Sequence, residues 1–292
     1  MRTSAAATQT RTGNSPATRT IELGPERSLH AAIAGAGADI VLLHGAMTTH
    51  LDWLDGPFEA LAGRGRAIAV DRPGHGLSRR PRFAGDPQVQ AAQLREGLRA
   101  LDVRRPVLVG HSFGCLCALT YAERYPDEVA GLVLIAPLAF AEFRPFEHLF
   151  LAPRAAPVIG PLLARATPRI VDREALEAAQ RIMFAPGQPD AAWRRNYPWA
   201  QILDPGAVVA NAEESAVIHP LSPEGAIDLA AIRTPARIIS GTADQVVRES
   251  LQAAPLAAAL PNAMHERVQG AGHMLHWTHG EVLVAAVREA LG

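Results

Sequence analysis

The sequence predicts an α/β protein: a mostly parallel central sheet with helices on both faces and an inserted, mainly helical cap. Short apolar runs that end in turn signals alternate with longer segments of helical length, which is the pattern of a parallel sheet covered on both faces. Between positions 140 and 225 this rhythm stops, and proline, arginine and bulky apolar residues take over. The chain has 292 residues, 48% of them hydrophobic, so it can bury the core that such a fold needs.

Six short apolar runs are the expected strands of the parallel sheet, because each is bounded by turn signals. They lie at 40–43, 67–70, 107–109, 132–135, 237–240 and 265–268. Two weaker runs, 20–23 and 29–33, are expected to form an antiparallel edge. The last element is a helix at 281–291, whose apolar residues recur at helical spacing.

These elements predict a core that is interrupted by the cap. Residues 1–19 are rich in Ser, Thr and Ala, with three arginines and no acid, so we expect a disordered tail. Residues 20–139 and 226–292 form the expected core, and 140–225 form the expected cap. The chain shows no internal repeat and no Cys/His spacing typical of a metal site.

Charge and cysteine content limit the partners and the location that we expect. A formal net charge of -1 gives no reason to expect a nucleic acid partner. No run approaches the roughly 20 apolar residues of a membrane span, so we expect no membrane partner. Cys115 and Cys117, the only cysteines, lie two apart on a predicted helix, where their side chains do not face each other. We therefore expect no disulfide and a cytoplasmic protein.

The stretch LVGHSFGCLCA, 108–118, places one serine between two glycines where a predicted strand turns into a helix. A serine hydroxyl acts as a nucleophile when it projects from the backbone and a base removes its proton. A tight strand-turn-helix provides the projection, and only small residues such as Gly110 and Gly114 fit beside so sharp a turn. Ser112 is therefore the expected nucleophile. The N–H of Phe113 starts the helix and becomes one donor to an oxyanion.

Two later loops can supply the acid and the base. GTADQVV, after the fifth predicted parallel strand, carries Asp244, and GAGHMLHW, after the sixth, carries His273. Both residues follow the C-terminal end of a strand, which is the edge where open α/β sheets build their sites. His273 lies directly after Gly272 and is the preferred base. His276 is expected to border the pocket or to pack structurally.

With these residues the chain resembles the α/β-hydrolase-fold serine hydrolases, which are esterase- and lipase-like enzymes. The resemblance covers roughly 20–139 and 226–292 and rests on the motifs LLHGAM, VDRPGHGLS, GHSFG, GTADQVV and GAGH, in that order. In that family the residue after the early His-Gly pair donates the second oxyanion N–H, which here is Ala46, and His44 is then structural. VDRPGHGLS matches a family turn that supports the active-site loops, through Asp71, Arg72, His75 and Ser78.

The resemblance implies cleavage of carboxylic esters of small or medium, largely apolar substrates through an acyl-enzyme, without a cofactor or a metal. Ser112 attacks the acyl carbon, His273 moves the proton, and Asp244 holds the imidazolium, while the N–H groups of Ala46 and Phe113 stabilise the oxyanion. A serine at the elbow speaks against the alkyl-enzyme chemistry of related dehalogenases and epoxide hydrolases, which need an aspartate there. A cofactor-free perhydrolase, a C–C bond hydrolase and an acyltransferase use the same triad and stay open.

Half of the eight phenylalanines fall at the start of the expected cap, at 140, 143, 146 and 150. Their spacing suits one side of a helix. We favour the interpretation that they pack the cap onto the core, and the alternative is that they line an apolar pocket. The expected partner is a small-molecule ester, and the oligomeric state is left open. The candidate pocket residues are Met47, Phe140, Phe143, Phe146 and His276.

Overall fold

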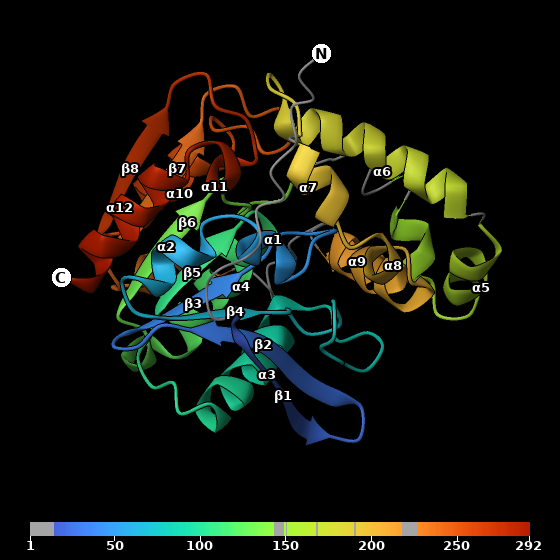
Figure 1. The fold of residues 1–292 in the computed structure, drawn as a ribbon, viewed down its shortest axis with the longest axis horizontal. Coiled ribbons are helices and arrows are strands. Elements are labelled where there is room, and N and C mark those ends of the chain that lie inside the picture. Colours follow the sequence, from blue (N-terminus) through green and yellow to red (C-terminus); the bar gives the residue numbers. More distant parts are fainter. Residues whose placement is uncertain (1–14, 143–148, 150, 168, 190, 218–226) are drawn as a thin grey trace, which may run out of the picture.

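The protein is built on an eight-stranded sheet, seen here in a computed structural model (Figure 1). The structure describes residues 15–142, 149, 151–167, 169–189, 191–217 and 227–292. The strands are β1 (Ala17–Gly24), β2 (Arg27–Ala34), β3 (Asp39–Leu43), β4 (Arg66–Val70), β5 (Val107–His111), β6 (Gly131–Ile135), β7 (Ala236–Gly241) and β8 (Ala263–Val268). Their order is β1-β2-β4-β3-β5-β6-β7-β8. The pairs β1–β2 and β2–β4 are antiparallel and the others are parallel, which confirms the predicted sheet and its antiparallel edge.

Alternate side chains of the strands fill two cores, one on each face of the sheet. In β3, Val41 and Leu43 belong to one core and Ile40 and Leu42 to the other, as the two-residue period of a strand requires. The first core is covered by α3 (Pro87–Ala100), α4 (Phe113–Arg124) and α10 (Ala253–Ala259). The second is covered by α1 (Leu51–Leu54), α2 (Phe58–Ala62), α11 (Leu275–Thr278) and α12 (Gly280–Leu291). A short 3-10 turn, η1 (Pro126–Glu128), precedes β6.

The first strand begins earlier than the sequence predicted. Residues 1–14 lie outside the described residues, and β1 starts at Ala17 rather than at position 20. Ala17 pairs with Ile33 of β2, so the ladder reaches back into the segment that we expected to be a disordered tail. Positions 17–19 of the predicted tail 1–19 are therefore strand, because backbone pairing with β2 orders them despite their polar side chains.

The chain between β6 and β7, 136–235, is called the insert below. Its described residues form helices and no strand: η3 (Ala152–Ala155), α5 (Ile159–Ala166), α6 (Arg169–Phe184), α7 (Ala191–Asn196), α8 (Trp199–Ile202), α9 (Pro205–Val217) and η5 (Leu229–Ala231). Figure 1 shows α5 to α9 grouped to the right of the sheet. The expected cap, 140–225, falls on this helical part, and its status as a separate domain stays a prediction.

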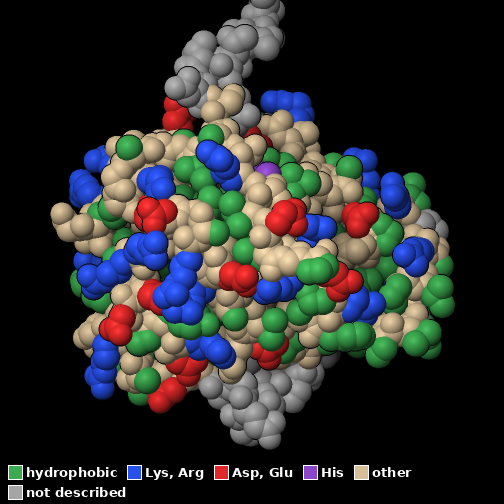
Figure 2. All heavy atoms as spheres, turned by 90° about the horizontal axis from the view of Figure 1, so that it is seen from below, with side chains coloured by type: hydrophobic (Ala, Val, Ile, Leu, Met, Phe, Trp, Pro, Cys, Tyr) green, Lys and Arg blue, Asp and Glu red, His purple; other side chains and the backbone are tan. Residues whose placement is uncertain are grey.

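The described surface carries both signs of charge and has one apolar end. Figure 2 shows basic and acidic side chains interspersed over the face that it draws. Hydrophobic side chains gather at the end formed by α5 and α6, where Val158, Leu162 and Ile170 are all at least 60% exposed. None of the described helices is both long enough and apolar enough to cross a lipid bilayer.

Candidate active site

Ser112 lies at the sharp turn between β5 and α4. Its backbone has φ 53° and ψ -118°, a conformation that residues other than glycine rarely adopt. The Ser112 N–H donates to the Ile135 carbonyl at the end of β6, 3.0 Å away, which ties the turn to the sheet. Gly110 precedes the serine, and a Cβ built on it would lie 2.7 Å from the backbone of Cys115. The local geometry is therefore that of a nucleophile elbow, with the side chain held away from the regular backbone.

The second elbow glycine, Gly114, is expected to tolerate no side chain. A Cβ built on it would lie 2.2 Å from the carbonyl oxygen of Leu43. Because that oxygen belongs to the backbone of β3, the clash can be relieved only by moving α4 away from the sheet. We expect Gly114→Ala to lower the free energy of unfolding by about 1–3 kcal/mol or more. Urea unfolding of the purified variant measures this loss.

Gly63→Ala is the matched control for that prediction. Gly63 ends α2 with an ordinary φ of -73°, and a Cβ there would meet the nearest backbone oxygen at 3.5 Å. We expect this variant to be as stable as the parent or slightly more stable, because alanine restricts the unfolded chain. Equal urea midpoints for the two alanine variants would contradict the packing argument.

Asp244 and His273 form a buried hydrogen-bonded pair at the same sheet edge as Ser112. Their loops follow β7 and β8, which run parallel to β5. His273 donates from Nδ1 to Oδ2 of Asp244 over 2.8 Å. The other carboxylate oxygen, Oδ1, accepts the N–H groups of Val246 and Val247 at 2.7 and 2.8 Å. The acid is therefore fixed by its own loop, and its bond to Nδ1 leaves Nε2 of His273 available for proton transfer.

The loop that carries His273 is pressed against the insert. The His273 N–H donates to the Met183 carbonyl near the end of α6 at 3.2 Å. A Cβ on Gly272 would lie 2.0 Å from the Ala185 carbonyl oxygen, so only glycine permits this approach. The Ala243 N–H also donates to the Ala271 carbonyl at 2.9 Å, which joins the acid loop to the base loop. The position of His273 therefore depends on contacts with the insert.

Two backbone N–H groups next to the serine are candidate oxyanion donors. Phe113 is the first residue of α4, and Ala46 lies in the loop after β3. A Cβ built on Gly45 would lie 3.3 Å from Cβ of Ser112, so the early loop passes directly beside the elbow. Within the described part of the chain, neither the Ala46 nor the Phe113 N–H donates to another backbone group. Both N–H groups are therefore available to a developing negative charge.

The candidate pocket residues are found in different surroundings. Met47, with φ 53°, lines a cavity of about 30 Å³ together with apolar residues of the insert. Phe140 is partly buried and packs against the first core, the one that α4 covers, and its N–H donates to Oε1 of Gln252 at 2.9 Å. Phe143 and Phe146 lie outside the described residues. The structure thus places Met47 at a cavity and gives Phe140 a packing contact.

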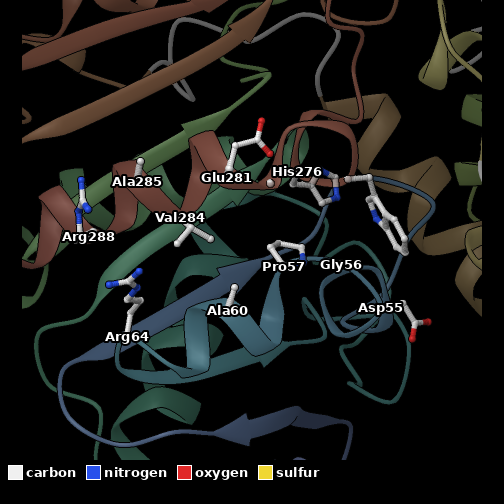
Figure 3. Close-up of a pocket in the computed structure, with 12 residues that line it drawn as sticks. Asp55, Gly56, Pro57, Ala60, Arg64, His276, Glu281, Val284, Ala285 and Arg288 are labelled. Atoms are coloured by element: carbon white, nitrogen blue, oxygen red, sulfur yellow. The ribbon is translucent and has the colours of Figure 1, made fainter. Parts of the chain in front are cut away.

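His276 is buried in a polar network with Asp52, three residues after His273. Its Nε2 donates to Oδ2 of Asp52 at 2.8 Å, and its ring lies 4.2 Å from the ring of His111, centroid to centroid. Burial alone would raise the pKa of Asp52, but the charge of His276 and three hydrogen bonds, two of them from Trp277 and Trp193, lower it. His276 and Trp277 also lie at a surface hollow of about 630 Å³ between α2 and α12 (Figure 3). This placement favours the packing interpretation of His276.

The structure also brings together residues that the sequence analysis did not assign. Asn211 on α9 accepts the Met47 N–H on Oδ1 at 2.8 Å, and Tyr197 donates its hydroxyl to the Met47 carbonyl at 2.5 Å. Glu214, one turn further along α9, binds Arg72 of the VDRPGHGLS motif at 2.6 Å. These contacts join positions more than 130 residues apart. No motif or spacing in the sequence predicts which of these residues meet.

Two clusters in the described part of the chain each bring three potential metal ligands within 4.8 Å of one another. They are His30, His50 and Asp71, and Asp52, His111 and His276. In both clusters the carboxylate already accepts N–H hydrogen bonds, from the ring of His50 on Asp71 and from Trp277 on Asp52. We interpret both clusters as hydrogen-bonded supports of the loops that surround the site.

Comparison with known proteins gives a family match over most of the chain, whereas the first curated relatives match only about a third of it. A model of the Alpha/beta hydrolase family matches residues 40–286. An uncharacterized protein of Mycobacterium bovis is 38% identical over 104 residues, which are 36% of this chain and 30% of that protein. A Synechocystis protein named "Putative non-heme chloroperoxidase" is 27% identical over 85% of this chain and 88% of its own length. A thermophilic esterase from Thermogutta terrifontis superimposes with a TM-score of 0.72 at 22% identity, covering 94% of this chain and 98% of the esterase.

Proposed function

Because the chain belongs to the alpha/beta hydrolase family, we propose that it is a serine hydrolase that cleaves carboxylic esters of small or medium, largely apolar substrates. The observation that carries the proposal is the 2.8 Å pair of His273 Nδ1 and Asp244 Oδ2, at the sheet edge where Ser112 occupies a strained elbow. A base oriented by a buried acid, next to a projecting hydroxyl, is the arrangement that activates a serine.

The reaction proceeds through an acyl-enzyme. Nε2 of His273 takes the Ser112 proton as Oγ attacks the acyl carbon, and the resulting imidazolium is held by Asp244. The N–H groups of Ala46 and Phe113 stabilise the oxyanion. His273 then gives the proton to the leaving alcohol. In the second half His273 removes a proton from water as the water oxygen attacks the acyl carbon. His273 then returns this proton to Oγ of Ser112, which releases the acid and restores the free serine.

A panel of substrates tests this function. The purified protein is assayed with p-nitrophenyl esters of increasing acyl length, and in parallel with ester plus hydrogen peroxide, lactones and dienoates. We expect turnover of short and medium esters with water as acceptor. Turnover of dienoates without ester hydrolysis would favour the C–C bond hydrolase. Product acylated on an added alcohol or thiol, in excess of free acid, would favour an acyltransferase.

Perhydrolysis is the second candidate, and the likeness to the chloroperoxidase-named Synechocystis protein favours it. Hydrogen peroxide would replace water in the second half-reaction, so the acyl-enzyme would release a peracid and free Ser112. The same triad and oxyanion donors would serve both reactions. Peracid formation faster than hydrolysis, at millimolar peroxide, would place this reaction above ester hydrolysis.

The cavity beside Met47 is the proposed acyl site, and it gives a prediction about chain length. Leu176 on α6 lines this cavity, and Leu176→Ala would enlarge it. We expect the preferred acyl chain to lengthen, because each methylene that becomes buried gains up to about 0.8 kcal/mol, roughly fourfold in kcat/KM. Profiles of kcat/KM against acyl length, for parent and variant, measure the change.

Ile182→Ala is the control on the same helix, because Ile182 is 49% exposed and does not line the cavity. It should leave the profile unchanged. If Leu176→Ala lowers Tm and keeps the parental preference, the cavity is a packing feature and not an acyl site. For Phe143 and Phe146, which lie outside the described residues, the pocket interpretation of the sequence predicts that substitution by alanine also lengthens the preferred acyl chain.

The cysteines give support for the cytoplasmic location that belongs to the same proposal. Cys115 and Cys117 are both free and buried, and burial raises the pKa of the Cys117 thiol to about 12. Unpaired, protonated thiols suit a reducing compartment and take no part in the chemistry. We further propose a small-molecule ester as the partner, with no nucleic acid or membrane partner.

A further inference from the structure

Helix α9 of the insert places two adjacent buried acids, Glu213 and Glu214, against the loop that follows β4. Glu214 is 1% exposed and binds the Arg72 guanidinium with both oxygens, at 2.6 and 3.0 Å. It also accepts from His75 Nε2 at 2.7 Å and from Gln90 Nε2 at 2.9 Å. Burial alone would raise the pKa of Glu214, but the charges of Arg72 and His75 outweigh it and hold the pKa well below its ordinary value.

Arg72 extends this contact to the loop after β3. Its Nε donates to the His44 carbonyl at 2.8 Å, and its Nη2 donates to the Gly45 carbonyl at 3.1 Å. The guanidinium carbon also lies 4.6 Å from the centre of the Phe113 ring. A single buried cation therefore touches the backbone before Ala46 and the side chain of Phe113, the two residues that carry the candidate oxyanion donors.

The Gly45 carbonyl is held by three donors. Besides Arg72, it accepts from His44 Nδ1 at 2.7 Å and from the Thr48 hydroxyl at 3.2 Å. His44 Nε2 accepts the Arg72 backbone N–H at 3.0 Å, so Nδ1 carries the proton that it donates. Burial and the Arg72 charge lower the pKa of His44 well below its ordinary value, which keeps the ring in this neutral form.

Fixing that carbonyl fixes the Ala46 N–H, because the two belong to one planar peptide. In a trans peptide C=O and N–H point in opposite directions, so the Ala46 N–H is aimed away from Arg72. On the other side of Ala46, the Met47 N–H is bound by Asn211, which lies three residues before Glu214 on α9 and so on the same face. Helix α9 thus holds the loop on both sides of Ala46.

We propose that Glu214 and Asn211 are positioning residues for the oxyanion hole, acting through Arg72 and the Met47 backbone to aim the Ala46 N–H at the reacting carbonyl. This inference rests on the proposed function. It makes the hole dependent on the insert, since both residues come from α9. Glu214 does not line the proposed acyl cavity, so its loss should weaken transition-state binding without weakening ground-state binding. Asn211 lines that cavity, so its loss is expected to raise KM as well as to lower kcat.

The test compares Glu214→Gln with Glu213→Gln in the full chain. Glu213 is a matched control, because it also binds the loop after β4 from α9, through Arg80 at 2.6 Å and the Phe83 N–H at 3.1 Å, but does not contact Arg72. We expect Glu214→Gln to lower kcat for the best ester about 10- to 100-fold at nearly constant KM, below the 10²–10³-fold cost of deleting an oxyanion donor. An alkyl boronic acid, whose serine adduct places an oxygen in the hole, should lose affinity by a similar factor. Glu213→Gln should change neither quantity by more than about threefold.

Asn211→Ala tests the inference if Glu214→Gln does not fold. It removes from α9 the acceptor of the Met47 N–H. We expect kcat and boronate affinity to fall by the same factors as for Glu214→Gln. If Glu214→Gln or Asn211→Ala folds and keeps the parental kcat and boronate affinity, the inference is overturned. Labelling of Ser112 by a fluorophosphonate, located by mass spectrometry, is measured first on the parent. A parent that is neither labelled nor hydrolytic would contradict the proposed function itself, whereas a labelled, hydrolytic parent with unaffected α9 variants would contradict only the role of α9.

Discussion

The Ser112→Ala variant is expected to lose ester turnover by about 10⁴-fold or more while it keeps its fold. The hydroxyl oxygen is the atom that forms the acyl-enzyme, and no other group at the elbow can replace it. Alanine is close in size to serine, so the backbone at φ 53° and the hydrogen bond from its N–H to Ile135 should persist. Initial rates with the best p-nitrophenyl ester, together with urea unfolding, measure the two parts of the prediction.

Ser240→Ala is the control, because Ser240 is a second buried serine at a strand end, and its hydroxyl contacts His265 and not the site. It should keep parental turnover. A double variant, Ser112→Ala with His273→Gln, should be no less active than the single serine variant, since the triad acts as a unit. If Ser112→Ala retained more than about 1% of parental turnover, the nucleophile would have to be sought elsewhere.

The parallel sheet and the elbow could be predicted because their signals are local. Strand 40–43 is an uninterrupted apolar run that ends at a turn signal, and the structure puts its residues alternately into two cores. Glycines at 110 and 114 indicate that backbone segments pass too close to these positions for a side chain, as they do at a tight turn. In the structure a Cβ on either glycine would clash with neighbouring backbone atoms. Asp244 and His273 could be paired because parallel strands bring their C-terminal ends to one edge of a sheet.

The remaining contacts could not be predicted because they join distant segments without a periodic signal. Glu214 binds Arg72 across 142 positions, and His276 binds Asp52 across 224. Adjacent acids in a helix usually form a solvated face, and a histidine three residues after the expected base usually borders the pocket. The start of β1 was missed for a related reason, since Ala17 is ordered by its pairing with Ile33 and not by its own side chain.

The two histidines of the base loop are expected to differ by several orders of magnitude in their effect on turnover. His273→Gln should lower kcat about 10⁴-fold or more, because an amide cannot take the serine proton. His276→Gln should keep kcat within about tenfold. The two histidines differ because they bind their aspartates through different ring nitrogens. His273 binds Asp244 through Nδ1 and leaves Nε2 for the serine, whereas His276 binds Asp52 through Nε2.

The same substitution at both positions makes each variant the control of the other, since both histidines are buried and both bind a buried carboxylate. His276→Gln should cost stability, by about 1–3 kcal/mol, because a flexible amide replaces the rigid ring that packs against His111 and donates to Asp52, which otherwise accepts from Trp277 and Trp193. Steady-state kinetics and urea unfolding on both variants separate the two roles. An equal collapse of kcat in both would mean that proton transfer runs through the Asp52–His276 pair as well, and a division between catalytic and packing histidines would have to be abandoned.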